Sequence, residues 1–405
     1  MKIIIRNCNV AELDIPLKYA IKLYNEFAIR HPNAFYLRTR QRGMQNWDGK
    51  IKYITKTGQF KIGLLPSVYK RCIELGIKPI IVDMRQPLPK VSKVVTQIGK
   101  YKLRPEQEKA VKAILSNKLG ETPFQIGVLD YTVNAGKTLI MSALYLSYKK
   151  QLKTLLITND SDWLNQARDE FKQYLPGEDI TFVQGKVLNW SNFTIGMVQS
   201  ISRNMKYYQN ELAKIDMVLI DEADQGGSKQ YQNVITRLFN TRVRIGLSGT
   251  IYMSKLAKDK VKNMNLRCFF GDVIAEFKLK DSIKKGYSTK TIVKTVEGKP
   301  WFGNWESDCM SYNEIYDDSI THNKISLNLA FDTLKWNLNQ GRYPALVVCK
   351  HIAHCENLCK FFKKKLDNKY NIACVHVNTH TKLRQQIMKD FREGKIDILV
   401  STTII

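Results

Sequence analysis

A glycine, a lysine and a threonine stand where an apolar run gives way to a helical pattern. Residues 124–129 have the composition of a buried strand, and residues 139–146 that of a helix. At such a helix start, backbone N–H groups and the helix dipole attract phosphate oxygens. A lysine there reaches the β and γ phosphates of a nucleotide, and a threonine hydroxyl holds Mg²⁺. The spacing predicts a phosphate-binding loop made of Val133, Asn134, Ala135, Gly136, Lys137 and Thr138.

The first position of this loop departs from the usual pattern. A glycine is expected there, and this chain has Tyr131. The alternative is an ordinary strand-to-helix turn in which Gly136 only caps the helix. Other parts of the chain must therefore decide between a nucleotide site and a simple turn.

Two adjacent carboxylates follow a second apolar run. Residues 217–220 predict a buried strand, and Asp221 and Glu222 come directly after it. Acids beside a buried strand are costly, so their position favours a chemical role. We expect Asp221 to hold Mg²⁺ through water and Glu222 to orient and deprotonate an attacking water. Lys137, Asp221 and Glu222 are the predicted catalytic residues, and Thr138 and Asp221 the metal-binding pair.

Small hydroxyl residues follow a third apolar run, within residues 244–250. We expect Ser248 and Thr250 to form hydrogen bonds towards Asp221 or Glu222. Such bonds would couple hydrolysis to movement of the chain.

An aromatic residue and an amide stand just before another helical pattern. We expect Tyr101 to stack on adenine and the Gln107 amide to pair with the edge of the base, with Arg104 between them. The alternative is a capped helix start that binds no ligand.

The elements that must position these groups alternate between strand and helix. Such alternation predicts a parallel sheet with helices on both faces, whose ligands bind beyond the carboxyl ends of the strands. Thr158, Gln199 and Ser200 fall at that edge and are expected to line a nucleic-acid path. A second alternating unit, without a phosphate loop, begins near residue 320.

The net charge indicates a polyanionic partner. The 405 residues include 64 Lys and Arg against 37 Asp and Glu, a net charge of +27. Residues 1–102 have 20 basic and 6 acidic side chains, so a quarter of the chain carries about half of the excess. Each basic group set against a phosphate releases a counterion, which favours nucleic acid as the partner, although a generic basic surface is the alternative.

Basic and aromatic residues interleave in the first 95 residues, which we expect to form a separate α+β domain. Arg38, Arg40, Arg42 and Lys50 are the predicted DNA contacts, and nearby aromatic residues suit base or sugar packing. A turn at residues 46–49 predicts a hairpin between strands at residues 35–38 and 51–54. The alternative is that the aromatic residues are core and the charges merely solvated.

Several classes of protein are disfavoured. No run of 18 apolar residues exists, and the N-terminus becomes polar too soon for a signal peptide. The eight cysteines lack the dense spacing of a disulfide scaffold and suggest reduced thiols, so we expect a cytoplasmic protein, without a membrane partner. The spacing of His351, His354, Cys355 and Cys359 resembles a metal site, but a helix face is the preferred interpretation.

Two further segments could contact nucleic acid. Residues 255–300 are rich in lysine and would extend a basic groove, although a solvated charge run is the usual interpretation. Trp301, Phe302 and Trp305 could form a wedge that separates strands, or could pack locally.

The ordered set of Gln107, Gly136-Lys137-Thr138, Asp221-Glu222, Ser248-Gly249-Thr250 and a second α/β unit resembles a superfamily 2 helicase, over roughly residues 100–405. Asn46-Trp47-Asp48-Gly49-Lys50-Ile51 and Gly63-Leu64-Leu65-Pro66 resemble the N-terminal domain of the phage UvsW-type branch-migration helicases. The resemblance implies two tandem RecA-like domains, ATP and Mg²⁺ as cofactors, and movement on branched DNA. It also implies that Thr379 and Thr402, with Gln199 and Ser200, contact the DNA backbone.

Two departures from the family pattern qualify this expectation. Asp-Glu-Ala-Asp at residues 221–224 is the signature of RNA helicases, but Thr-Asn-Asp-Ser and Ser-Gly-Thr stand where those enzymes have other motifs. The chain also stops at Ile405, where the next family motif would start, before the motif with the arginine fingers. We therefore expect these residues to be a fragment, or the ordered part, of a longer protein.

The sequence predicts a DNA-directed ATPase motor, expected to act as a monomer. The predicted domains are residues 1–95, a basic α+β domain; residues 96–300, a RecA-like domain with the phosphate loop; and residues 301–405, a linker and an incomplete second RecA-like domain. An RNA helicase, a non-catalytic DNA clamp switched by nucleotide and a restriction-enzyme motor subunit remain as alternatives.

Overall fold

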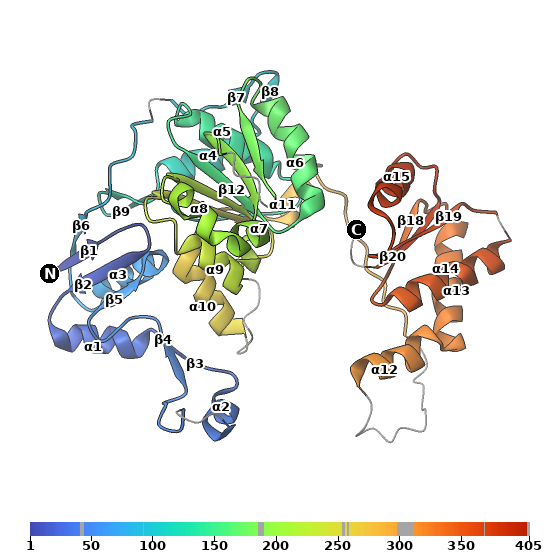
Figure 1. The fold of residues 1–405 in the computed structure, drawn as a ribbon, viewed down its shortest axis with the longest axis horizontal. Helices are drawn as coiled ribbons and strands as arrows, with labels where there is room; N and C mark the ends of the chain where they lie inside the picture. Colours follow the sequence, from blue (N-terminus) through green and yellow to red (C-terminus); the bar gives the residue numbers. More distant parts are fainter. Residues whose placement is uncertain are drawn as a thin grey trace. The chain divides into compact units, whose positions relative to one another are not determined.

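The computed structural model describes residues 1–40, 44–91, 93–184, 190–252, 256, 259–297, 311–367 and 369–402. They form two compact units, Met1–Lys290 and Thr291–Ile405 (Figure 1). The phosphate loop and both acidic residues lie in the first unit.

A seven-stranded parallel sheet is the framework of the first unit, with the strand order β13-β14-β12-β15-β16-β11-β17. Each neighbouring pair of strands is parallel, which confirms the predicted α/β fold. The strands are β11 (Ile126–Tyr131), β12 (Thr154–Thr158), β13 (Ile180–Val183), β14 (Phe193–Met197), β15 (Met217–Asp221), β16 (Val243–Ser248) and β17 (Val273–Phe277). Their carboxyl ends meet at one edge, so residues far apart in the sequence converge there.

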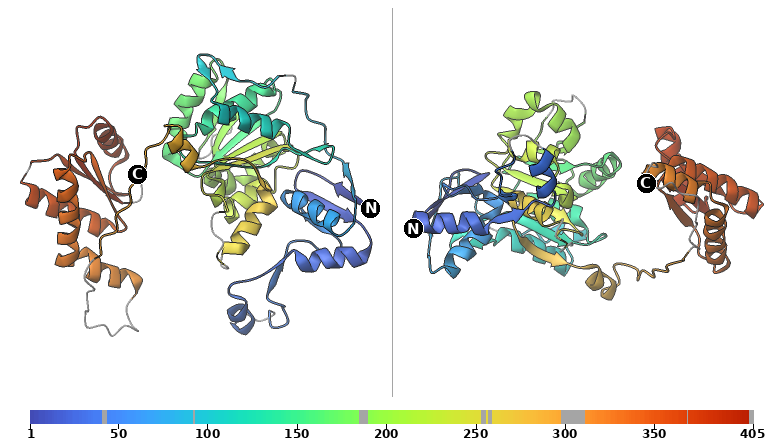
Figure 2. Two further views of the ribbon diagram at one scale, coloured as in Figure 1. Left: turned by 180° about the vertical axis from the view of Figure 1, so that it is seen from behind. Right: turned by 90° about the horizontal axis from the view of Figure 1, so that it is seen from below.

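Helices cover both faces of this sheet, as Figure 2 shows from two further directions. The apolar residues of one face pack with α4 (Pro105–Leu115), α5 (Lys137–Ser147) and α6 (Ser161–Tyr174). Those of the other face pack with α7 (Val198–Arg203), α8 (Met205–Leu212), α9 (Lys229–Ile235) and α10 (Asp259–Phe270). Successive side chains of a strand point to opposite faces, so strands buried on both sides read as unbroken apolar runs. The short helix α11 (Leu279–Lys284) follows β17.

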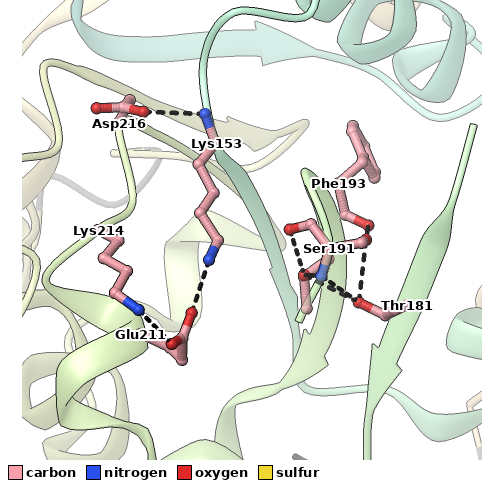
Figure 3. A network of polar contacts seen from close by, with 8 residues as sticks. Lys153, Thr181, Ser191, Phe193, Glu211, Lys214 and Asp216 are labelled. Atoms are coloured by element: carbon pink, nitrogen blue, oxygen red, sulfur yellow. Dashed lines mark hydrogen bonds and ion pairs between the residues drawn. The ribbon is translucent and has the colours of Figure 1, made fainter. Parts of the chain in front are cut away.

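Polar contacts tie the amino ends of the strands together, away from the phosphate loop (Figure 3). The backbone N–H of Lys153 donates to the Asp216 carboxylate at 2.9 Å. The Nζ of Lys153 lies 2.6 Å from Glu211, which also pairs with Lys214 at 2.7 Å. Lys153 precedes β12 and Asp216 precedes β15, so this network fixes the start of both strands.

The N-terminal residues form a second, mixed sheet within the same unit, in the order β5-β2-β1-β6. Its elements are β1 (Lys2–Ile5), β2 (Val10–Asp14), β5 (Gln59–Lys61), β6 (Ile80–Asp83), α1 (Leu17–Glu26) and α3 (Leu65–Glu74). Ile3 and Phe60 of this sheet share one apolar core with Val128 and Phe270 of the parallel-sheet region. Two-stranded ribbons, β7 (Gln97–Ile98) with β8 (Tyr101–Lys102) and β9 (Lys118–Leu119) with β10 (Thr122–Pro123), lie between the N-terminal sheet and β11 in sequence.

A buried arginine joins the two sheets. Arg244, in β16, is fully buried, and its Nη2 donates at 2.8 Å to both the carbonyl of Cys8 and the Oδ1 of Asn9. Its Nη1 donates to the carbonyl of Phe269 at 3.2 Å. Burial lowers the pKa of Arg244 to about 10. The turn between β1 and β2 therefore supplies hydrogen bonds that a charged side chain of the parallel sheet requires.

One predicted hairpin is wrong. Residues 35–38 lie in a helix, α2 (Ala34–Arg40), and β4 (Lys50–Lys52) pairs instead with β3 (Ala28–Arg30). Only Ala34 of α2 is buried, so its aromatic residues find no sheet face to cover. We call β3, α2 and β4, with residues 28–40 and 44–52, the basic finger, and it projects from the rest of the unit (Figure 1).

The second unit contains a three-stranded parallel sheet in the order β18-β20-β19. Its elements are α12 (Tyr312–Tyr316), the π-helix η3 (Asp317–Thr321), α13 (Lys324–Asn339), β18 (Ala345–Cys349), α14 (Ile352–Leu366), β19 (Ile372–Val375), α15 (Thr381–Arg392) and β20 (Ile398–Thr402). The alternation predicted from residue 320 onward is confirmed. Among the residues that the structure describes, no helix is both long and apolar enough to span a bilayer.

Candidate functional site

The backbone of the predicted phosphate loop turns through two left-handed residues before α5 begins at Lys137. Asn134 has φ +61° and Gly136 has φ +71°. A Cβ on Gly136 would collide with the side-chain amide of Gln107, so this position requires glycine for both its dihedral and its space. Val133 is exposed at the tip of the loop, and Ala135 is buried beneath it.

Tyr131, the residue that departs from the loop pattern, is part of the core. It is the last residue of β11 and is completely buried. Its hydroxyl donates to the carbonyl of Glu106 at 2.8 Å, and burial raises its pKa to about 12. Tyr131 therefore fixes the start of the loop to α4, which explains how the loop forms without the usual glycine.

Both the oxygen and the nitrogen of the Gln107 side-chain amide form hydrogen bonds within the protein. Its Oε1 accepts from the backbone N–H of Arg104 at 2.8 Å, and its Nε2 donates to the carbonyl of Ala135 at 2.9 Å. Gln107 is also buried. It thus positions the phosphate loop, and the expected pairing with adenine would compete with these two bonds.

The other two predicted base contacts pack against aromatic rings. The guanidinium of Arg104 lies 4.2 Å from the ring centroid of Tyr287. The ring of Tyr101 meets that of Tyr174 edge to face, with the centroids 5.1 Å apart. Arg104 is also joined to the loop, since its Nη1 lies 3.4 Å from the carbonyl oxygen of Asn134.

Lys137 and Asp221 meet across the carboxyl edge of the sheet. The Nζ of Lys137 lies 3.7 Å from Oδ1 of Asp221. Asp221 is buried, and burial raises its pKa although Lys137 opposes the shift. Its Oδ1 has no hydrogen-bond partner among the residues that the structure describes. A buried, unsatisfied carboxylate oxygen beside a threonine-bearing phosphate loop fits a hard cation such as Mg²⁺.

Glu222 occupies a strained turn next to this pair. Its φ is +53°, a conformation that is uncommon for residues other than glycine. Burial raises its pKa, and the charges of Asp221 and Asp224 add to the shift, while Lys137 opposes it. A carboxylate with a raised pKa is a better proton acceptor than an ordinary glutamate, as a general base requires.

Ser248 reaches a different acid from the one expected. Its Oγ donates to Oδ1 of Asp224 at 2.8 Å, whereas the sequence pointed to Asp221 or Glu222. The Thr250 backbone N–H donates to Ser248 Oγ at 3.1 Å, and the two hydroxyl oxygens lie 3.3 Å apart. The bond crosses from the end of β16 to the turn after β15, and these strands are neighbours. Asp224 lies within the recognised tetrapeptide, so its position alone could have identified it.

A chain of side-chain amides lies along the same edge. Asn159 Nδ2 donates to Gln225 Oε1 at 2.9 Å, and Gln199 Nε2 donates to the carbonyl of Asn159 at 3.2 Å. The sequence singled out Gln199 for DNA contact but gave no signal for Gln225. We call these three residues the amide relay, which joins the end of β12 to α7 and to the turn after β15.

The remaining predicted nucleic-acid contacts differ in accessibility. Thr158 is 1% exposed, and its hydroxyl accepts from the Asp160 backbone N–H at 3.2 Å, so a direct contact there would require rearrangement. Ser200 lies in α7, and its carbonyl accepts from Asn204 at 2.9 Å. In the second unit, Thr379 is partly exposed and its hydroxyl accepts from the His376 backbone N–H at 3.1 Å. Thr402 ends β20 and is 4% exposed.

The basic finger carries its predicted contacts on the surface. Arg38, Arg40 and Lys50 are exposed, while Arg42 lies outside the described residues. The predicted wedge at residues 301–305 also lies outside them.

Two lysines of the lysine-rich segment after residue 255 form ion pairs within the unit. They therefore add less positive charge to the expected basic groove. Lys278 pairs with the buried Asp130, and Lys285 lies 2.7 Å from Glu106. They fix the segment after β17 to β11 and α4, so their charge is partly neutralised.

The histidines and cysteines at positions 351–359, whose spacing resembles a metal site, make packing contacts within the second unit. His354 Nδ1 lies 3.0 Å from the hydroxyl of Tyr316, and the sulfurs of Cys355 and Cys374 are 3.4 Å apart. Within the described residues, no group of three or more His, Cys, Asp or Glu side chains is arranged to hold a metal ion.

Two family models match the chain. The model described as "Type III restriction enzyme, res subunit" matches residues 100–253, and the model described as "Helicase conserved C-terminal domain" matches residues 328–405. The first match contains the phosphate loop, the acidic turn and the Ser248–Thr250 segment.

The chain also aligns with a curated helicase along most of its length. It is 24% identical to the ATP-dependent DNA helicase uvsW of Enterobacteria phage T4 over 387 residues, which is 88% of this chain and 72% of that protein. The chain is thus similar to the UvsW-type helicases of superfamily 2. Residues of this UvsW-like chain are also 26% identical over 147 positions to a putative ATP-dependent RNA helicase of Acanthamoeba polyphaga mimivirus, covering 36% of the chain and 27% of that protein.

Solved structures of UvsW from bacteriophage T4 have the same fold. One has a TM-score of 0.54 at 21% identity and covers 68% of this UvsW-like chain and 100% of its own. The other has a TM-score of 0.52 at 18% identity and covers 99% of this chain and 80% of its own. The predicted pair of RecA-like domains is therefore confirmed as the fold of the chain.

Proposed function

We propose that the chain is an ATP-dependent DNA helicase that unwinds forked DNA and moves the branch point of Holliday junctions, as a monomer, in replication, recombination and repair. The observation that carries the proposal is the 3.7 Å approach of Lys137 to Asp221 at the edge of a parallel sheet. The similarity to a phage DNA helicase over 88% of the chain supports DNA as the substrate. It also supports a bacteriophage, which we propose to be phage T5, as the source, and the host cytoplasm as the location.

The domain roles follow from the same proposal. Residues 1–95 would grip duplex DNA, residues 96–300 would bind ATP on the phosphate loop, and residues 301–405 would complete the motor. The N-terminal sheet packs against the parallel-sheet region, so the grip would be a fixed part of the first motor domain.

In this proposal, residues of the first motor domain share the work of hydrolysis. Lys137 neutralises charge on the phosphates, and Thr138 and Asp221 hold Mg²⁺, which would supply further charge neutralisation when bound. Glu222 accepts a proton from the attacking water. Tyr101, Arg104 and Gln107 flank the site on the α4 side, where Gln107 holds the loop through Ala135.

The nucleic-acid path of the first unit would run along the edge that carries Gln199 and Ser200. In the second unit, Thr379 and Thr402 are the proposed contacts to the DNA backbone. The exposed Arg38, Arg40 and Lys50 would contact duplex phosphates. Asp224, which accepts from Ser248, would relay the state of the acidic turn to β16.

Steady-state ATP hydrolysis tests the proposal. We expect forked DNA to stimulate wild-type turnover and Lys137→Ala to abolish it, while DNA binding stays near the wild-type level. DNA-stimulated turnover by Lys137→Ala would contradict the assignment of the phosphate loop.

An RNA helicase is the second candidate, favoured by the match to a putative RNA helicase over 36% of the chain. Forked RNA of matched sequence is the discriminating substrate in the same assay. Stimulation by RNA but not by DNA would replace our proposal with this one.

A further inference from the structure

A phenylalanine in the helix of the basic finger is exposed to solvent. Phe35 is 81% exposed, whereas the fully buried aromatic residues of this unit pack in its core. It lies in α2, which the two-stranded ribbon of β3 and β4 joins to the rest of the unit (Figure 2). A ring this exposed gains nothing from folding, so its apolar surface remains available to a partner.

The positive charge around Phe35 indicates that this partner is a polyanion. Residues 28–52 contain six Lys and Arg side chains and one acid, Asp48. The single acid is already engaged, because its carboxylate lies 3.1 Å from Nζ of Lys52 and accepts from the Lys50 backbone N–H at 2.9 Å. An apolar ring within a basic surface matches nucleic acid, which offers phosphates outside and flat bases inside.

The base of the finger is held in place, so the ring is presented on a defined support. Trp47 Nε1 donates to the Lys50 carbonyl at 2.9 Å, and the Tyr53 hydroxyl lies 3.0 Å from Asn265 Oδ1 in α10. Gly49 has φ +75°, and a Cβ there would lie 3.0 Å from the Cβ of Ala34, so the turn packs closely against the start of α2.

The neighbouring ring has a different role. Tyr36 is 52% exposed, and the Arg40 guanidinium lies 4.7 Å from its centroid. Arg40 Nη1 also donates to the Tyr36 hydroxyl at 3.2 Å. Tyr36 therefore orients an arginine for phosphate contact.

We infer that Phe35 inserts between bases at the branch point of DNA, while Arg38 and Arg40 hold the adjacent phosphates. A branch point offers bases that are already partly unstacked, so insertion costs less there than in continuous duplex. The finger would thus recognise the junction itself. This inference rests on the proposed function, because it assigns the branched-DNA specificity of the helicase to one side chain.

Equilibrium binding with 2-aminopurine at the branch point tests the inference. Forked DNA and continuous duplex of the same length are each titrated with wild type, Phe35→Ala, Phe35→Trp and the control Tyr207→Ala, which removes another exposed aromatic ring of the first unit, 66% exposed. We expect Phe35→Ala to weaken fork binding about tenfold, the scale of one lost base–aromatic stack, with little change on continuous duplex. It should also lose the increase in 2-aminopurine fluorescence, and Phe35→Trp should restore both signals.

Salt dependence separates insertion from phosphate contact. Phe35→Ala should leave the slope of log K against log salt unchanged, whereas Arg38→Gln with Arg40→Gln should reduce it by about two. Wild-type fork affinity in Phe35→Ala, or an equal loss on continuous duplex, would overturn the inference. In either case DNA would still stimulate ATP hydrolysis by the wild-type protein. If the proposed function itself were wrong, DNA would not stimulate ATP hydrolysis by the wild-type protein.

Discussion

The Ser248 hydroxyl donates a 2.8 Å hydrogen bond to the Asp224 carboxylate, and the bond joins the end of β16 to the acidic turn after β15. Asp224 stands three residues after Asp221, which pairs with Lys137. A change at the phosphate site can therefore reach β16 through one short turn.

Ser248→Ala removes this bond and should separate hydrolysis from movement. We expect the substituted protein to keep ATP hydrolysis within about threefold of wild type, because the lost neutral-to-charged hydrogen bond lies outside the reacting groups. Unwinding of forked DNA should fall far more. The measurement is the number of base pairs opened per ATP hydrolysed, with Ser248→Thr as the variant that retains a hydroxyl. An unchanged ratio in Ser248→Ala would contradict the coupling role.

Gly136→Ala should abolish nucleotide binding without unfolding the protein. The new Cβ would strain a residue with φ +71° and collide with Gln107, which holds the loop through Ala135. The matched control is Gly177→Ala, where φ is +82° but nothing lies within 4 Å of the added Cβ. Titration with a fluorescent ATP analogue measures the effect, and near wild-type affinity in Gly136→Ala would show that the loop does not bind phosphate in this conformation.

The amide relay predicts a selective loss of DNA stimulation. Asn159→Ala removes the bond to Gln225 and leaves Lys137 and Asp221 in place. Basal ATP hydrolysis should persist, while stimulation by single-stranded DNA should fall about fivefold, the scale of one ordinary side-chain hydrogen bond. The same assay on Gln199→Ala should give the same pattern. Loss of basal and stimulated rates in equal proportion would instead assign Asn159 to the hydrolysis site.

Acidification should lower the stability of the second unit, because His354 becomes protonated more readily in the unfolded chain. Burial lowers the pKa of this histidine below its ordinary value of 6.5, and the nearby charge of His351 adds to the shift, while Asp317 opposes it. Between the pKa of His354 in the folded chain and its pKa in the unfolded chain, the unfolded chain binds more protons. The contribution of His354 to stability is therefore fully present above about pH 6.5 and is lost as the pH drops below it. Hydrogen exchange of the α14 amides at about pH 7.5 and about pH 5.5 should show this, and His354→Gln should reduce the difference. Equal pH dependence in wild type and His354→Gln would contradict the role of His354.

Asn9→Ala should destabilise the first unit through a residue distant in sequence. It removes the Oδ1 that accepts from the buried guanidinium of Arg244 at 2.8 Å. We expect a loss of about 2 kcal/mol in the free energy of unfolding, as for a hydrogen bond to a buried charge. Asn210→Ala, at an exposed position of α8, is the control for chemical denaturation. Equal midpoints for the two variants would show that the Cys8 and Phe269 carbonyls are sufficient.

The parallel sheet and the position of the phosphate loop were predictable because their signals are local in sequence. An apolar run followed by Gly136-Lys137-Thr138 specifies strand, loop and helix within about fifteen residues, the range over which periodicity is informative. The acidic pair after β15 has the same property. Parallel pairing then brings both to one edge without further information.

Other features depended on contacts that no local pattern contains. The bond of Gln107 to Ala135 spans 28 positions, and that of Asn159 to Gln225 spans 66. The α2 error has a related cause: Phe35 and Tyr36 favour strands only when a pleated surface buries them, and here both rings face solvent.

The fully buried Arg244 has a mechanical consequence. β16 begins at Val243, beside the bond from Arg244 to Asn9, and ends at Ser248, which contacts Asp224. One short strand therefore contacts the turn between β1 and β2 at one end and the acidic turn at the other. A load applied to the N-terminal residues around Asn9 while DNA is being pulled would act on the same strand whose far end contacts the acidic turn, so resistance from the DNA would reach the hydrolysis site through β16.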